Sequence, residues 1–203
     1  MIAALLLAEA LTAFCALAFE TATARLVAPH AGLSTDSWTA IIAGFLLSWA
    51  LGNHLGGTFA RDSARLSLFI AATAILSGAA AIALTPAMLP ILDEWIMAPD
   101  PLARWRAVMF AAVPTLLPGF LLGIAPPLLM LAIIARGGGP GALVGLANAA
   151  GAAGSAAGAV SVLWFGLDLL GARGTCLAIG ALGALGATLV AAAACFLGPR
   201  QPA

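Results

Sequence analysis

Residues 2–27 read IAALLLAEALTAFCALAFETATARLV. This stretch is longer than the about 20 mostly apolar residues that a helix needs to cross the hydrocarbon core of a bilayer. A cleaved secretion signal would begin with basic residues and contain a short apolar core, whereas Glu9 interrupts this one and its apolar character continues to Val27. The stretch therefore predicts a retained transmembrane helix.

The composition of the whole chain agrees with that interpretation. Of its 203 residues, 63% are hydrophobic and 8% are charged, and the mean hydropathy is +1.11. A soluble domain carries about 25% charged residues, because water must wet its surface. Most of this surface is therefore expected to face lipid. Eight basic residues balance eight acidic ones, so the chain lacks the basic face that a nucleic-acid partner requires.

The same length criterion, applied along the chain, predicts an all-α integral membrane bundle that forms one domain over residues 1–203. Short connections rich in turn-forming residues separate most of the apolar runs. Residues 89–104 are the longest connection, and their acidic, tryptophan and proline residues predict a short helix along the membrane surface. The six predicted spans are residues 2–27, 38–60, 66–88, 106–134, 142–166 and 173–197.

The fourth predicted span is too long for a straight crossing and contains Pro114, Pro118, Pro126 and Pro127. Proline lacks the backbone N–H that continues a helix, so a kink is expected, and the freed carbonyls need partners inside the protein. Tryptophans fall near the ends of the predicted spans, which is typical of an aromatic belt at one membrane interface. Because the arginines divide equally between the two sides, charge alone does not set the orientation. The belt residues are Trp38, Trp95, Trp105 and Trp164.

Small residues recur at three- or four-residue spacing in several spans. Such residues let two helix backbones approach closely, so that dispersion contacts replace the hydrophobic drive that lipid does not supply. A ligand-facing role for individual glycines is the alternative. The predicted packing residues are Ser48, Gly52 and Gly56 in the second span, Gly151, Gly154 and Gly158 in the fifth, and Gly180, Gly183 and Ala187 in the sixth.

A few polar residues at bilayer depth need an explanation, because an ionised side chain there costs about 2.5–3.5 kcal/mol. Glu9 and Glu20 lie close to three helical turns apart and therefore share one face. One interpretation couples Glu9 to His54 and turns Glu20 toward a cavity that binds a cation or relays protons. The other is structural, with Glu9 reaching the interface and Glu20 paired with Arg25. The candidate binding residues are Glu9, Glu20, Arg25, Asn53, His54 and Asn148.

Sequence motifs for catalysis and for metal or cofactor binding are absent. The chain has no Gly-rich phosphate loop, no His-Glu-x-x-His helix, no Gly-x-Ser-x-Gly elbow and no CxxC pair. Cys15, Cys176 and Cys195 match no metal or redox spacing. With two histidines and no tyrosine, general acids and bases are few. We expect no enzymatic activity, no cofactor and no bound metal.

Two stretches of the chain resemble a known family. The first contains Glu20, Arg25 and Leu51-Gly52-Asn53-His54-Leu55-Gly56-Gly57, and the second contains Gly119-Phe120-Leu121-Leu122-Gly123-Ile124-Ala125-Pro126, followed by Gly145-Leu146-Ala147-Asn148. Together they resemble the membrane region of bacterial fused, spermidine-synthase-like membrane proteins, which is itself similar to half of a major-facilitator transporter. His30 departs from the pattern, since that family has an aromatic residue after the proline.

The resemblance implies a multi-pass protein of the bacterial inner membrane with cytoplasmic N- and C-termini. In that family a soluble aminopropyltransferase-like domain commonly follows the membrane region, and its nucleotide-binding glycines and catalytic aspartate have no counterpart here. The resemblance therefore does not imply polyamine synthesis.

Three functions are open at this point. The leading expectation is a non-enzymatic subunit or self-associating unit of a membrane complex, whose partners are the lipid bilayer and either other membrane chains or a second copy. The second is a small-molecule or cation transporter with Glu9, Glu20 and His54 along its path. The third, which rests on the resemblance alone, is a membrane anchor for a separately encoded synthase-like enzyme.

Overall fold

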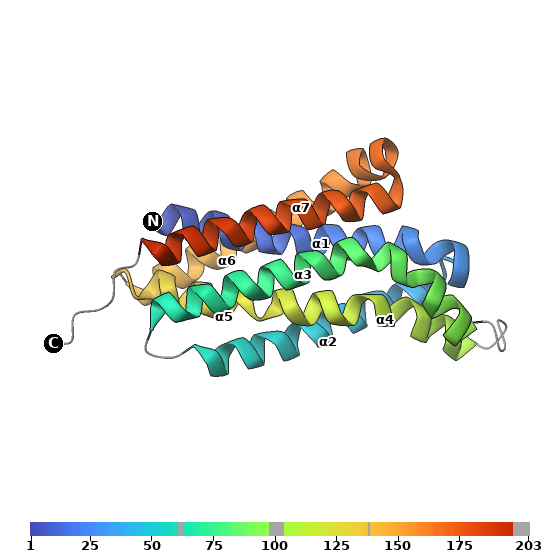
Figure 1. Cartoon of the computed structure of the whole chain (residues 1–203), viewed down its shortest axis with the longest axis horizontal. Helices are drawn as coiled ribbons and strands as arrows, with labels where there is room; N and C mark the ends of the chain where they lie inside the picture. Colours follow the sequence, from blue (N-terminus) through green and yellow to red (C-terminus); the bar gives the residue numbers. More distant parts are fainter. Residues whose placement is uncertain (61–62, 98–103, 138, 197–203) are drawn as a thin grey trace.

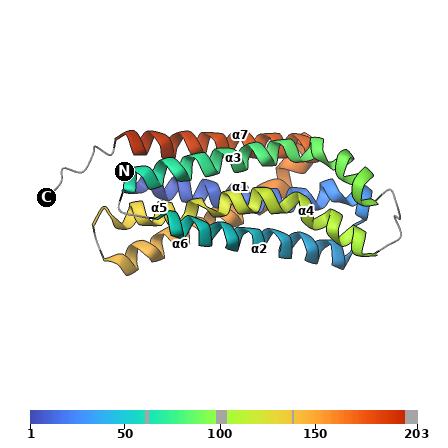
Figure 2. The same ribbon diagram turned by 60° about the horizontal axis from the view of Figure 1, so that its bottom comes forward.

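The structure is a computed structural model that describes residues 1–60, 63–97, 104–137 and 139–196. Its regular elements in this part of the chain are all helices, which confirms the all-α fold class. Long helices lie side by side in an elongated bundle (Figures 1 and 2). The elements are α1 (Ile2–Ala31), α2 (Thr35–Phe59), α3 (Ala64–Leu92), η1 (Asp93–Met97), α4 (Arg104–Gly123), α5 (Ala125–Ile134), α6 (Pro140–Ser161), η2 (Val162–Gly166) and α7 (Leu167–Cys195).

Large apolar side chains cover the outside of the bundle. Leu47 on α2, Leu84 on α3 and Leu185 on α7 are 64%, 59% and 60% exposed. A water-soluble protein rarely exposes apolar patches that extend over several elements. The outer surface is therefore compatible with a membrane protein whose helices face lipid.

Five continuous helical segments among the described residues are long and apolar enough to cross a membrane, rather than the six that were predicted. The difference lies in residues 140–195, which form one helical run of 56 residues with a sharp turn inside it, instead of two spans and a loop. Within that run, Gly171 has φ 65° and ψ 175°, a backbone conformation that is essentially restricted to glycine. The chain reverses direction in this region, so α6 and α7 run antiparallel (Figures 1 and 2).

The fourth predicted span is interrupted at Ile124, between α4 and α5. Pro126 and Pro127 come two and three residues after Ile124 and cannot donate to the carbonyls of Leu122 and Gly123. Ile124 N instead donates to Leu121 O at 3.3 Å, a tighter helical turn. Pro114 and Pro118 lie inside α4 without ending it. The break therefore falls at the proline pair.

The prediction of a separate surface helix over residues 89–104 is wrong for residues 89–97, because these continue the helix before them. Residues 89–92 continue α3, and Asp93–Met97 form the π-helix η1 directly after it. The apolar helix of α3 tolerates Pro86 and Pro90 and runs on into this wider turn, where the Asp93 N–H bonds to the carbonyls of Leu89 and Pro90. Arg106 of α4 donates to Ile96 O at 3.2 Å and holds the end of η1. Pro99, Asp100 and Pro101 lie outside the described residues.

The helices pack in pairs around α1, which lies in the middle of the bundle (Figure 2). The closest pairs are α2 with α4, α1 with α6, and α3 with α7. α1 and α2 therefore have different main neighbours, and they contact each other much less than either contacts its main neighbour.

Glycines allow the backbones of these paired helices to approach each other closely. On α2, a Cβ at Gly52 would collide with the carbonyl of Phe120, and one at Gly56 with the carbonyl of Ile124, while Ser48 contacts Gly119. On α6, a Cβ at Gly154 would collide with the carbonyl oxygen of Ala10. Three further members of the α6 and α7 stripes are also tightly packed: Gly158 faces the Phe14 carbonyl, Gly180 faces the Ala79 carbonyl and Gly183 faces the Ala79 side chain. Gly151 is not, because a Cβ there would make only an ordinary contact with Glu9. The paired helices thus pack at these glycines largely through direct contact between their backbones.

Candidate functional site

A groove with a volume of about 210 Å³ lies between α1, α2 and α6. We call it the Glu20 groove. The groove forms because α2 packs mainly against α4, and α6 packs mainly against α1. The surface of α1 between α2 and α6 is therefore not covered. Its lining residues are Ala16, Leu17 and Glu20 from α1, Phe45, Leu46 and Trp49 from α2, and Ser155 from α6.

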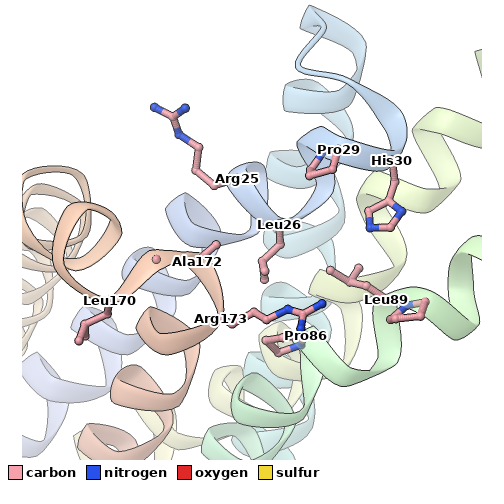
Figure 3. A pocket seen from close by; sticks show the side chains of 11 residues that line it. Arg25, Leu26, Pro29, His30, Pro86, Leu89, Leu170, Ala172 and Arg173 are labelled. Atoms are coloured by element: carbon pink, nitrogen blue, oxygen red, sulfur yellow. The ribbon is translucent and has the colours of Figure 1, made fainter.

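Glu20 is the charged residue of this groove. It is only 9% exposed, yet it makes no hydrogen bond or ion pair with any residue that the structure describes. The expected pairing of Glu20 with Arg25 is not formed. Arg25 is exposed, one and a half turns further along α1, and its side chain extends away from the other labelled residues (Figure 3). The carboxyl group therefore faces the groove without a counter-charge.

The opposite wall of the groove is aromatic. Phe45 and Trp49 lie one turn apart on α2, and their rings stack with centroids 5.8 Å apart and an interplanar angle of 29°. Ser155 adds a hydroxyl from α6, which donates weakly to Ala13 O at 3.4 Å. Neither Phe45 nor Trp49 was among the predicted site residues. A signal was present, because Trp49 is the tryptophan that falls in the middle of a predicted span.

Asn53 makes hydrogen bonds to two structural partners, a backbone carbonyl and a side chain. With its amide oriented to satisfy both neighbours, its nitrogen donates to Gly123 O at 3.0 Å and its oxygen accepts from Trp49 Nε1 at 2.8 Å. The Gly123 carbonyl needs such a donor because Pro127, four residues later, has no N–H to offer. Asn53 thus supplies one of the partners that the proline pair requires, and it also positions the groove residue Trp49.

The structure does not bring Glu9 and His54 together. Glu9 lies against α6, where its Oε1 would be 3.5 Å from a Cβ on Gly151, and its Oε2 is buried with no hydrogen-bond partner among the described residues. His54 and Asn148 are exposed on α2 and α6, and neither makes a hydrogen bond or ion pair within the described chain. The proposed coupling assumed that α1 and α2 are close neighbours, but α6 takes that place beside Glu9.

A second cavity, of about 480 Å³, lies between the C-terminal ends of α1 and α3 and the part of α7 around Gly171. Arg25, His30 and Arg173 line it together with leucine and proline side chains (Figure 3). His30 Nδ1 lies 3.2 Å from Asp93 Oδ1, and the His30 ring packs on Phe110 with centroids 5.1 Å apart. In Figure 3 the Arg173 side chain runs toward Pro86 of α3, away from Arg25. The two guanidinium groups do not converge on one point.

Within the residues that the structure describes, no three His, Cys, Asp or Glu side chains gather in a way that could hold a metal ion. The three cysteines are free thiols, two buried and one exposed. Comparison of the chain with protein-family models, with curated proteins and with solved structures gave no match.

Proposed function

We propose that this chain is a non-enzymatic, multi-pass protein of a bacterial inner membrane that works as a subunit of a membrane complex, with a second copy or another membrane chain as its partner. The observation that supports this is the unpartnered Glu20 in a groove on the outside of the bundle. Glu20 lies about 5 Å along the helix axis from the middle of α1, at 1.5 Å per residue. The hydrocarbon core extends about 15 Å from its midplane. Glu20 would therefore face lipid tails unless another polypeptide covers the groove.

An exposed face of α6, on the side away from Ser155 and the Glu20 groove, suits a further helix. Small residues recur there at every fourth position, and all of them are exposed. In a bilayer such a row allows a further helix to pack closely, as the glycines inside the bundle do. The exposed row consists of Gly141, Gly145, Ala149, Ala153 and Ala157.

For the topology we propose six crossings, with the run Pro140–Cys195 crossing twice. α6 has 22 residues and α7 has 29, so each is long enough to cross alone. The start of α1 and the end of α7 lie at the same end of the bundle (Figure 1). Four exposed tryptophans belong to elements that lie toward the opposite end: Trp38 in the first turn of α2, Trp95 in η1, Trp105 at the start of α4 and Trp164 in η2. Cytoplasmic termini follow from the family resemblance.

Labelling of single cysteines tests the topology. In a variant whose other cysteines are replaced, the exposed Cys195 and an introduced Leu169→Cys should react with a membrane-impermeant maleimide from opposite sides of the membrane. Labelling of both from the same side would contradict the two crossings.

Purification tests the complex. In a mild detergent or in nanodiscs, the particle should contain either two or more copies of the chain or a co-purifying membrane protein, as mass measurement shows. Ala153→Leu, on the exposed row, should reduce the assembled fraction, whereas Ala181→Leu on an exposed position of α7 should not. A particle that is a lone monomer, with no other chain, would refute the proposal.

A further inference from the structure

We infer that the Glu20 groove binds a small organic ammonium ion, with the Glu20 carboxylate as its counter-charge and Phe45 and Trp49 as its apolar wall. This inference rests on the proposed function, because a covering partner chain would shield the bound ion from lipid. It deepens that proposal by naming the class of ligand.

Glu20 is the group that would bind a cation. More than nine-tenths of the residue is buried, it lines the groove, and the described part of the chain provides no donor to its carboxyl group. At bilayer depth a carboxyl group remains ionised only when a positive charge pairs with it, and otherwise it binds a proton. No lysine, arginine or histidine is among the groove residues. A positive charge that pairs with the ionised Glu20 would therefore come from outside the part of the chain that the structure describes.

The lining favours an organic cation over a metal ion. Calcium takes six to eight oxygen ligands and magnesium takes six, as a rule. The groove offers the carboxylate of Glu20 and the hydroxyl of Ser155, which is turned toward Ala13 O. The other lining side chains are aliphatic or aromatic. Aromatic rings attract ammonium groups and contact their alkyl substituents, but they do not replace the water shell of a metal ion.

The volume limits the size of the ligand. Pockets for drug-sized molecules occupy about 300–1,000 Å³, whereas the Glu20 groove has about 210 Å³. An ammonium ion with only a few carbon atoms fits this space. Tetramethylammonium is a suitable probe, because it carries one charge, has an apolar surface and cannot lose a proton.

The test is calorimetric titration of the purified particle, in detergent, with tetramethylammonium chloride, and separately with sodium chloride. We expect saturable binding of tetramethylammonium and none of sodium. Glu20→Gln keeps the shape of the side chain but removes its charge, so it should weaken binding at least about tenfold. The matched control is Glu94→Gln, which neutralises an exposed carboxylate in η1 and should leave the affinity unchanged.

A second variant, Ser155→Leu, narrows the groove from α6 without touching the carboxylate and should also weaken binding; it decides the question if Glu20→Gln does not fold. The inference is overturned if tetramethylammonium does not bind, if sodium binds equally well, or if binding survives in the folded variants. A particle that assembles but does not bind the probe overturns this inference alone. A monomer that binds the probe in a Glu20-dependent manner overturns the proposed complex alone.

Discussion

The contact between α1 and α6 can be tested with a single methyl group. Gly154 of α6 lies directly over α1, and a Cβ at this position would overlap the carbonyl oxygen of Ala10 and come within 2.9 Å of its Cα. Real Cβ atoms do not approach other atoms that closely. Both obstructing atoms belong to the backbone, so neither can rotate aside as a side chain would. Gly154→Ala should therefore force α6 away from α1.

The expected magnitude follows from measured costs of overpacking. Adding a methyl group to a well-packed interface costs about 1–3 kcal/mol. Replacing glycine in a helix by alanine gains about 0.4–1 kcal/mol where no contact opposes it. We expect the loss to dominate at Gly154, because the carbonyl of Ala10 is held by the helix α1. The net decrease in the free energy of unfolding should be about 1–2 kcal/mol.

The same helix provides two matched controls. A Cβ at Gly151 would lie 3.5 Å from Glu9 Oε1, an ordinary contact, and one at Gly145 would meet nothing within 4 Å. Both alanine variants should be as stable as the parent chain or slightly more stable. The assay is equilibrium unfolding in mixed micelles with increasing dodecyl sulfate, followed by far-ultraviolet circular dichroism. If Gly154→Ala unfolds at the same midpoint as Gly145→Ala, the close approach of α1 and α6 is refuted.

Three further substitutions test the backbone features of the bundle in the same assay. Asn53→Ala leaves the Gly123 carbonyl without a donor and should cost about 1–3 kcal/mol, whereas Asn148→Ala, at an exposed amide, should change stability little. Pro127→Ala restores an N–H to that carbonyl, so a double-mutant cycle should show that Asn53→Ala costs less in this background; additive effects would contradict the proposed pairing. Gly171→Ala places a side chain on a residue with φ 65° and ψ 175° and should cost about 1–3 kcal/mol, and an unchanged midpoint would argue against this reversal.

The fold class was predictable from the sequence because lipid imposes a strong requirement. A chain with 63% hydrophobic residues and apolar runs of 20 or more must satisfy its backbone hydrogen bonds within helices if it lies in a bilayer. The small-residue rows at Ser48–Gly56 and Gly151–Gly158 were also visible, since close packing leaves a periodic signature on one helix. The sequence further indicated that the carbonyls before Pro126 and Pro127 need partners.

The boundaries of individual segments were less predictable. Residues 89–97 carry prolines, acidic residues and a tryptophan, but the apolar helix before them continues through this stretch as α3 and η1. The turn near Gly171 interrupts the helical geometry at one residue, so residues 140–195 count as one helical run. Local composition did not reveal either outcome, because Arg106 of α4 holds the end of η1, and a single glycine is enough for the turn near Gly171.

The sequence by itself determined that this chain is helical and apolar, which of its faces are small, and that Glu20 needs an explanation. Only the tertiary structure decided which helices meet. It paired α2 with α4 and α1 with α6, placed Glu9 beside Gly151 instead of His54, and opened the groove in which Glu20 faces Phe45 and Trp49. The physical reason is that a row of small residues makes a helix able to pack closely but does not specify its partner, which depends on the fit of all the helices together.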